Sequence, residues 1–440
     1  MPYPFSINRI PCRLGTNAPL RRPIGIGVAF GALLAFAAPG LPAQESGARF
    51  GIDDRLTVDA LVSAVLEQNP RLRAAEAAAE AAAYRIDPAG SLDDPMLSYT
   101  LAPRSSDQNI DFSQRLPWPG TLRAREAVAE SEAAAARSAV GVDELTLAAA
   151  AKSAYAEWYF VARALDIYHA VEVLADELIA TAEARYAAGS ASKQDVLQAE
   201  VERADLASRL LQLTRQQTAA RARLNALLNR PPEAPLPSAE PIAVQPPPPD
   251  AGVLERLALD RHPELRRLDV QIEGAQSRVA LARKAFYPDF QIRAGYNTLW
   301  DESDKRAVLG VAISMPLDRG KREAELDRTQ AEVRRAEWTL ANRRAQLLAD
   351  LARSHAEVVE SVRAIELYER ELLPLAAEYL DAAIADYQSG TGAFLNVVTA
   401  ERRRFATELA LERARADYLR RLAELELSAG GTLDAAANPR

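Results

Sequence analysis

Residues able to bind a metal or to carry out catalysis are few and scattered in this chain of 440 residues. Its histidines, His169, His262 and His355, each stand alone, and its one cysteine is Cys12. A protein-bound zinc or copper ion needs several such ligands at short spacing. The chain also contains no glycine-rich phosphate loop, no H-E-x-x-H and no G-x-S-x-G sequence. We therefore expect no resident metal site, no cofactor and no enzymatic activity.

One stretch of sequence occurs twice, and the rest of the chain is organised around it. Residues 186–200 read YAAGSASKQDVLQAE, and residues 387–401 read YQSGTGAFLNVVTAE. Both copies follow the pattern Y-x-x-G-x5-[DN]-V and lie between long apolar-periodic segments. A glycine that ends one helix shortly before the next begins is typical of a tight helical turn. The pattern predicts two helix–turn–helix tips, at residues 186–195 and 387–396.

The flanking sequence predicts the helices that must carry these tips. Segments with few breakers and with apolar residues three and four apart predict long helices over residues 121–185, 195–229, 321–387 and 395–427. Pro374 should kink the third of them. Shorter helices are expected over residues 56–86, broken or kinked at Pro70, and over residues 254–286.

Four short runs alternate apolar and polar residues with a period of two, which is typical of β-strands. They form two pairs, within residues 95–116 and 289–315, and each pair predicts a β-hairpin. Four strands are too few to close a barrel, and an isolated hairpin is marginal in water. Either the strands form a small soluble sheet packed on helices, or several copies of the chain contribute strands to one shared barrel.

The order short helix, hairpin, long helix, tip and helix therefore occurs twice, over residues 44–230 and 251–427. A proline-rich connector, residues 231–250, joins these repeats and should run extended along the surface. Residues 428–440 are expected to be a loosely ordered tail. At 1.5 Å per residue, two stacked shorter helices match one long helix. The tips and the strands should therefore lie at opposite ends.

The first 43 residues have the features of a secretory signal peptide, with an N-terminal membrane anchor as the alternative. Four arginines precede an apolar run over residues 24–38, which proline, glycine and small residues follow. Loss of this segment would remove four of 53 basic residues and none of 61 acidic ones, leaving a net charge of −12 and no cysteine. The acidic balance argues against a nucleic-acid partner. No later run is apolar enough to predict a transmembrane helix.

This organisation resembles the TolC family of outer-membrane efflux proteins over nearly the whole mature chain. The resemblance rests on the two tips, on the sequences N-P-x-L at Asn69 and H-P-E-L at His262, and on Y-P-D-F at Tyr287. The segment QRLPWPG, residues 114–120, resembles the strand-to-helix junction in the heavy-metal branch of that family. The implied fold is mostly α with a small β part. Long helices would form a coiled-coil α-helical barrel, and four strands per protomer would contribute to a trimeric 12-stranded transmembrane β-barrel.

The resemblance also implies a location, partners and a function. The protein would be a homotrimer in the outer membrane of a Gram-negative cell, in contact with lipid and with a long periplasmic portion. It would be the exit duct of a tripartite efflux system, joined by a periplasmic adaptor (membrane fusion) protein to an inner-membrane RND-type pump. Heavy-metal cations are the first expected substrate. The alternatives are multidrug efflux or type I secretion through the same channel, or a periplasmic coiled-coil scaffold without a pore.

In such a channel the tips would form the periplasmic entrance, closed at rest, and dock the adaptor. Asp195 could face the lumen or pair across the entrance. Alternatively, it could be no more than an acidic residue that the positive end of a helix dipole stabilises. Its equivalent in the second repeat is Asn396, which carries no charge. Tyr186 and Tyr387 could bond neighbouring hairpins, or could serve only in helix packing. The other candidates would end a helix, form the tip seam or meet the adaptor: Gly189, Val196, Leu197, Gly390, Val397 and Val398.

Overall fold

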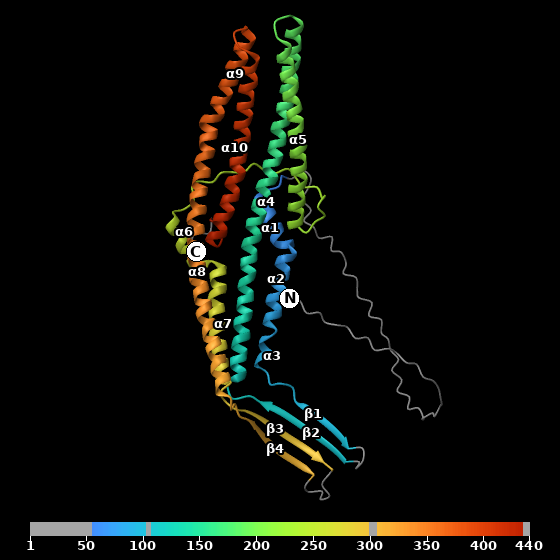
Figure 1. The fold of residues 1–440 in the computed structure, drawn as a ribbon, viewed down its shortest axis with the longest axis vertical. Coiled ribbons are helices and arrows are strands. Elements are labelled where there is room, and N and C mark those ends of the chain that lie inside the picture. The colour runs from blue at the N-terminus through green and yellow to red at the C-terminus, as the bar shows by residue number, and fades with distance from the viewer. Residues whose placement is uncertain (1–54, 103–106, 299–305, 434–440) are drawn as a thin grey trace, which may run out of the picture. The chain divides into compact units, whose positions relative to one another are not determined.

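A computed structural model of the chain describes residues 55–102, 107–298 and 306–433 (Figure 1). All of them belong to one compact unit, which extends from Ser46 to Arg440. The other unit, Met1–Glu45, holds the expected signal peptide and lies outside the described residues. The expectation for that segment therefore stays a prediction.

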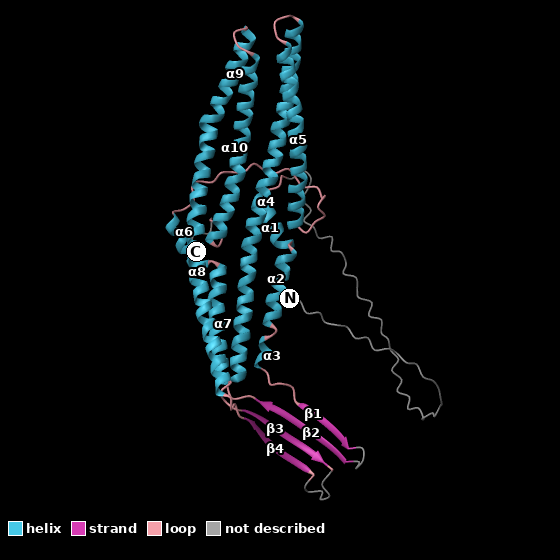
Figure 2. Ribbon diagram, in the orientation of Figure 1, coloured by secondary structure: helices cyan, strands magenta, loops and turns pink. Residues whose placement is uncertain are grey.

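Most of the described residues are helical, and the two halves follow the same order (Figure 2). The first half contains α1 (Val58–Gln68), α2 (Pro70–Ala83), α3 (Ile86–Gly90), α4 (Thr121–Ala187) and α5 (Lys193–Leu227). The second half contains α6 (Ala251–Arg261), α7 (Pro263–Lys284), α8 (Arg319–Leu367), α9 (Leu373–Ser389) and α10 (Phe394–Ala429). In the part of the chain that the structure describes, none of these helices is long and apolar enough to cross a membrane.

The break between the first two helices of each half has the same atomic design. The predicted break at Pro70 is confirmed, since Asn69 separates α1 from α2. The side chain of Asn69 accepts a hydrogen bond from the N–H of Arg71 (2.9 Å) and donates one to the carbonyl oxygen of Leu227 (2.9 Å). In the second half, Nδ1 of His262 accepts from the N–H of Glu264 (3.2 Å), and its Nε2 lies 3.1 Å from the carbonyl oxygen of Leu427. Each residue thus caps one helix and holds the end of another.

The second long helix is interrupted near Pro374, as predicted, but by a π-helical turn. Residues Tyr368–Leu372 form this turn between α8 and α9. Proline has no N–H to donate to the carbonyl group four residues earlier, so the regular hydrogen-bond ladder cannot continue. By contrast, α4 runs for 67 residues without a break.

The four strands form one antiparallel sheet in the order β1 (Met96–Ala102), β2 (Asp107–Leu116), β3 (Asp289–Asn297) and β4 (Ala307–Ser314). The two halves meet through β2 and β3, where Phe112 lies opposite Ala294. Directly opposed residues point to the same side of a sheet. One side therefore carries large exposed apolar residues from all four strands: Leu97, Tyr99, Leu101, Ile110, Phe112, Ile292, Tyr296, Leu309, Val311 and Ile313. The other side is mostly polar, and we call these two sides the apolar face and the polar face.

The main core lies midway along α4 and fixes the proline-rich connector. The hydroxyl of Tyr155, buried in α4, lies 2.8 Å from the carbonyl oxygens of both Leu56 and Glu240. Nε1 of Trp158 donates to the carbonyl oxygen of Pro237 (3.2 Å). The connector is thus held against α4 by hydrogen bonds and does not act as a free hinge.

The C-terminal tail begins later than expected. Residue 428 was the expected start, but α10 continues to Ala429, and Gly430 ends it in the left-handed conformation (φ 84°). A side chain at Gly430 would meet the backbone of His262 at 3.0 Å, so only glycine fits this close approach. Leu433 is still buried, whereas residues 434–440 lie outside the described part.

Candidate functional site: the two helical tips

The tips are the ends of two helical hairpins, α4–α5 and α9–α10, and lie at the end of α4 remote from the sheet (Figure 1). A small apolar cluster, separate from the main core, joins the hairpins. Its buried members come from α4, α5, α9 and α10: Ala182, Ala199, Leu380, Ala383, Tyr387, Phe394, Val397, Val398 and Ala400. The mutual packing of the hairpins therefore depends on small residues and a few larger anchors.

Both turns are closed by glycine in the left-handed conformation, as predicted. Gly189 has a φ of 72° and Gly390 a φ of 82°. After Gly189, the N–H of Ser190 donates to the carbonyl oxygen of Arg185 (2.9 Å). After Gly390, the N–H of Thr391 donates to the carbonyl oxygen of Asp386 (3.0 Å). These bonds satisfy carbonyl groups at the helix end that the helix itself leaves open.

Asp195 has a local partner. Its carboxylate accepts a hydrogen bond from the N–H of Ser192 (3.2 Å), and the hydroxyl of Ser192 accepts one from the N–H of Asp195 (3.3 Å). This reciprocal pair is a capping box at the start of α5. The contacts that Asp195 makes within the described chain therefore agree with a role at the start of a helix, where the helix dipole favours a negative charge. At the start of α10, Ala393 provides no such cap, and Asn396 is exposed.

Arg185 joins the two hairpins. Its Nη1 donates to the carbonyl oxygen of Tyr387 (2.8 Å), and its guanidinium group lies 4.2 Å from the centre of the Tyr387 ring. The ring of Tyr387 also contacts Phe394, with centroids 5.5 Å apart and ring planes at 59°. Tyr387 is buried, and its hydroxyl has no hydrogen-bond partner within the described part of the chain.

The two tyrosines predicted as equivalent thus have different environments. Tyr186 is 49% exposed, whereas Tyr387 is 7% exposed. The apolar candidates also divide. Val397 and Val398 are buried in the cluster and Val196 packs at its edge, whereas Leu197 is half exposed. The sequence did not predict a role at the tips for Arg185 or Phe394. For Phe394, the available signal was an apolar residue at the first position of α10.

A buried carboxyl group, that of Glu401, lies about one helical turn after Val397 and Val398 on α10. Glu401 is 6% exposed, and burial raises its pKa to about 7. Burial is the largest cause of this net shift; the nearby Glu202 also contributes to the rise in the pKa, and Arg402 opposes it. Arg402 itself pairs with Glu202 of α5, with 2.9 Å between Nε and Oε2. This charged pair ties α5 to α10 beside the buried carboxyl group of Glu401.

Metal ligands do not gather at the tips or elsewhere in the described segments. There, no three histidine, cysteine, aspartate or glutamate side chains lie close enough to hold an ion together. His169 lies 3.6 Å from Glu172 on the same helix, and His262 and His355 each contact a backbone carbonyl oxygen. What the described geometry shows at the tips is helix packing within and between the two hairpins.

Comparison with known families gives a match over most of the chain. Residues 61–230 and 254–431 both match the family model described as outer membrane efflux protein. These two segments cover the same halves that repeat the element order. The match also extends over both β-hairpins and both helical tips.

Two curated proteins share sequence with the chain. The cobalt-zinc-cadmium resistance protein CzcC of Cupriavidus metallidurans is 26% identical over 226 residues, which cover 51% of this chain and 53% of that protein. The pyoverdine export outer membrane protein OpmQ of Pseudomonas aeruginosa is 27% identical over 339 residues, which cover 74% of this chain and 67% of that protein. The chain thus matches only about half the length of the first relative.

The fold is similar to that of solved channel structures. The outer-membrane channel OprN superposes with a TM-score of 0.73 at 21% identity, covering 86% of this chain and 90% of that one. At this identity the likeness concerns the fold alone.

Proposed function

Because this chain belongs to the outer membrane efflux protein family, we propose that it forms the exit duct of a tripartite efflux system. It is an outer-membrane protein with a long periplasmic helical portion. The proposed duct runs from the tips, as periplasmic entrance, to the strands in the membrane. Its work is transport, for which the chain supplies a path and the pump supplies the energy.

The apolar face of the sheet is the observation that carries this proposal. Leu309 is 85% exposed, Leu97 71% and Val311 69%, and all three point to the same side. A soluble sheet would bury such residues against helices, whereas a membrane barrel turns them towards lipid and its polar residues towards the lumen. The apolar face therefore favours the membrane interpretation over a small soluble sheet.

We propose that three copies complete the barrel and the helical duct. Among the residues that the structure describes, β1 and β4 each have one edge without a strand partner. Exposed apolar residues also occur on α5, such as Leu211, and on α9, such as Tyr379, where a neighbouring copy would cover them. We further propose that the exposed tip residues Tyr186 and Leu197 meet a periplasmic adaptor protein.

Heavy-metal cations are the substrate class that we propose first. Support comes from residues 114–120, which form the junction between β2 and α4, and from the similarity to CzcC, a protein named for cobalt, zinc and cadmium resistance. At this junction Trp118 stacks on Tyr287, with ring centroids 4.9 Å apart. The longer match to OpmQ, a protein named for pyoverdine export, supports an organic substrate as the second candidate.

Growth of a strain lacking this chain tests the substrate. The strain is grown on salts of copper, silver, zinc, cobalt, cadmium and nickel, and on a panel of drugs and bile salts. Sensitivity to metals alone, reversed by the intact gene, would support metal export and name the ion. Sensitivity to organic compounds alone would contradict metal export and leave the channel in place.

A pair of strand variants tests the channel itself against a scaffold without a pore. Leu309→Arg places a charge on the apolar face and should cost about 2–4 kcal/mol in the middle of a bilayer. Ala312→Arg, on the polar face of the same strand, is the matched control and should be tolerated. We expect only Leu309→Arg to reduce the amount of protein that needs detergent for its release from membranes. Equal behaviour of both variants, or release of the native chain by salt, would support the scaffold.

A further inference from the structure

A cavity of about 630 Å³ lies where the sheet meets the helices. Residues of β2, β3 and β4 line it together with residues of α4, α7 and α8. The lining strand residues Arg115, Asp289 and Ser314 all belong to the polar face, because Asp289 lies opposite Ser314 and Arg115 opposite Gln291. The cavity therefore opens on the side of the sheet away from the apolar face.

The charges around this cavity are strongly unequal. Six basic residues line it, against only two acidic ones, Asp289 and Glu325. The basic residues are Arg115, Arg125, Arg278, Lys284, Arg322 and Arg328. In a chain whose net charge is −8, such a local excess of positive charge is a specific feature of this place.

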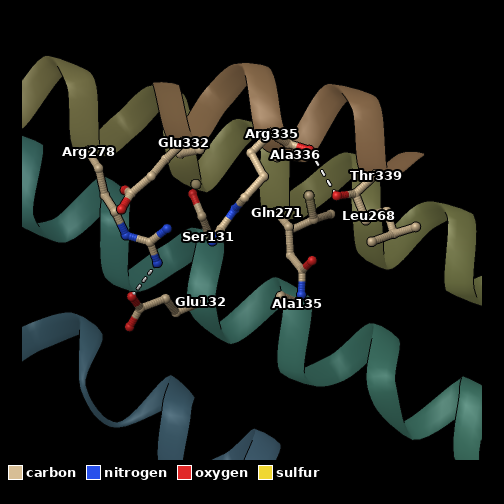
Figure 3. Close-up of a pocket in the computed structure, with 13 residues that line it drawn as sticks. Ser131, Glu132, Ala135, Leu268, Gln271, Arg278, Glu332, Arg335, Ala336 and Thr339 are labelled. Carbon is tan, nitrogen blue, oxygen red and sulfur yellow. Dashed lines mark hydrogen bonds and ion pairs between the residues drawn. The ribbon is translucent and has the colours of Figure 1, made fainter. Parts of the chain in front are cut away.

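Four of the six basic residues are paired with carboxylates. Nη2 of Arg115 lies 3.2 Å from Asp289. Figure 3 shows how Arg278, which borders a neighbouring cavity as well, turns to Glu132 of α4 (2.9 Å). Arg125 pairs with Asp93 (3.7 Å), and Arg328 with Glu325 and Glu332 (2.5 and 2.6 Å). These four side chains already have counter-charges.

Within the described segments, the side chains of Lys284 and Arg322 form hydrogen bonds only to backbone oxygens. Nζ of Lys284 lies 3.4 Å from the carbonyl oxygen of Pro119. Arg322 donates from Nε to the carbonyl oxygen of Ala285 (2.9 Å) and from Nη1 to that of Asp318 (2.8 Å). Among the described residues, neither has a carboxylate partner, and Nη2 of Arg322 has no acceptor. Two positive charges and several N–H donors are therefore available to a ligand.

A second, independent feature of the cavity is an unsatisfied hydroxyl group. Thr121 lines the cavity and is 92% buried, since only 8% of it is exposed. In the described part of the chain its Oγ1 has no hydrogen-bond partner. A buried polar group without a partner costs free energy, so such a group in a cavity wall commonly has a ligand or water.

Thr121 is also the first residue of α4, and this helix has no side-chain cap. Its N-cap is Gly120, which is in the left-handed conformation (φ 84°). The free N–H groups and the dipole at the start of a helix attract anions. A side chain at Gly120 would lie 3.1 Å from Nζ of Lys284, so glycine here leaves room for the lysine. The junction sequence that ends in Gly120 thus holds Lys284 beside the start of α4.

We propose that this cavity is an anion-binding site for a phosphate or carboxylate group, held by Lys284, Arg322, the hydroxyl of Thr121 and the start of α4. Its position on the polar face favours an anionic solute within the duct as the source of that group. The binding site does not require the proposed export function. Only the role of the bound group in transport rests on the proposed export function. Within the transport path, a basic site would favour anionic substrates or anionic complexes of a metal.

Binding to the purified full-length protein in detergent tests the site. The probes are inorganic phosphate and citrate, added at constant ionic strength with chloride as the reference, and the readouts are calorimetry and the apparent melting temperature. A ligand that binds the folded state raises that temperature in a saturable way. We expect Lys284→Gln to weaken phosphate binding about tenfold, the effect of one charged hydrogen bond. Thr121→Val, of nearly the same shape, should weaken it by a smaller factor.

Lys321→Gln is the matched control, because it removes the same charge from an exposed residue at the start of α8. It should leave phosphate binding unchanged. No saturable binding of either probe, or an equal loss in Lys284→Gln and Lys321→Gln, would overturn the proposal. Because calorimetry needs no transport, a failure of the site and a failure of the export function remain distinguishable.

A second arm separates a solute from a lipid headgroup as the source of the phosphate. The protein is placed in nanodiscs of phosphatidylglycerol or of phosphatidylcholine, and retained lipid is measured by native mass spectrometry. Binding of free phosphate with no lipid lost in Lys284→Gln identifies a solute site. Retained phosphatidylglycerol that is lost in Lys284→Gln and kept in Lys321→Gln identifies a headgroup site. Both results support an anion site, whereas absence of both contradicts it.

Discussion

The guanidinium group of Arg185 lies 4.2 Å from the ring centre of Tyr387 and donates a 2.8 Å hydrogen bond to the carbonyl oxygen of the same residue. The two residues are 202 positions apart and belong to different hairpins. One side chain thus makes a polar and an aromatic contact across the seam between the tips. This contact is the clearest candidate for holding the hairpins together.

Replacement of Arg185 by methionine should loosen the pairing of the hairpins. The substitution keeps an apolar stem and removes a charged hydrogen bond, together worth about 2 kcal/mol with the cation–π contact. Spin labels at Lys193→Cys and Leu395→Cys, both exposed tip positions, should show a broader and longer distance distribution. The only native cysteine is Cys12, so a Cys12→Ser background leaves no competing label site.

Arg203→Met is the control for this measurement. Arg203 pairs with Asp176 at 2.5 Å within the first hairpin, and in the described part of the chain it has no ion pair with the second hairpin. The Arg203→Met substitution therefore removes one arginine without changing the contact between Arg185 and Tyr387. Equal broadening in both variants would show that the Arg185–Tyr387 contact has no special role.

The hydroxyl of Tyr387 supplies a second prediction. It is buried and lacks a partner in the described chain, so Tyr387→Phe should leave the apparent melting temperature unchanged or raise it. Tyr387→Ala should instead cost about 3–5 kcal/mol, because the contacts with Phe394 and Arg185 are lost. The exposed Tyr186→Phe is the neutral control. A clearly lower melting temperature in Tyr387→Phe would mean that a neighbouring copy forms a hydrogen bond with this hydroxyl. Such a bond is what a role of Tyr387 in joining neighbouring hairpins requires.

Glu401 should make the tip less stable as pH rises. Its pKa in the folded chain is about 7, above the ordinary value of 4.5, so the folded state binds its proton more tightly than the unfolded state. This contribution is complete below pH 4.5 and is lost as pH rises to about 7. Glu401→Gln should remove this part of the pH dependence when melting is followed between those values.

Glu200→Gln is the matched control for Glu401. Glu200 occupies the same place in the first repeat but is exposed. Its replacement should leave the pH profile as it is. If both glutamine variants have the profile of the unmodified chain, Glu401 does not titrate in this range.

His262 should have the opposite pH dependence. Burial lowers its pKa below the ordinary 6.5, so the folded chain resists protonation and loses stability as pH falls below that value. His262→Asn copies the solution that Asn69 provides in the first half, so it should be nearly neutral at pH 8 and less sensitive to acid. His262→Ala should cost about 1–2 kcal/mol through the lost helix cap. The reverse exchange, Asn69→His, should introduce acid sensitivity, and its absence would contradict this account.

The sequence was enough to predict the local geometry of the tips and the sheet. Glycine after a helix, and alternation with a period of two, depend only on neighbours along the chain. Gly189 and Gly390 accordingly have positive φ angles, and the strands form where the alternating runs occur. The position of the break near Pro374 was equally local, although its π-helical form was not predicted.

Contacts between distant segments could not be predicted in this way. Glu200 and Glu401 are equivalent in the repeat, yet one is exposed and the other buried, because only Glu401 lies where the two hairpins pack together, near Glu202 of α5. The same holds for Tyr186 and Tyr387. The partner of Arg185 is likewise set by the packing of two hairpins, which a pattern within either hairpin does not contain.

The open edges of the sheet also limit how the protein can assemble. The outer edges of β1 and β4 leave their backbone N–H and carbonyl groups without strand partners in the described chain. Water can satisfy such groups, but hydrocarbon cannot, and each unsatisfied group there costs several kcal/mol. A lone chain therefore gains little by entering a bilayer, whatever the number of its apolar residues. In the proposed multi-copy channel, insertion and association would be coupled, and the concentration of folded chains at the membrane surface would set their rate.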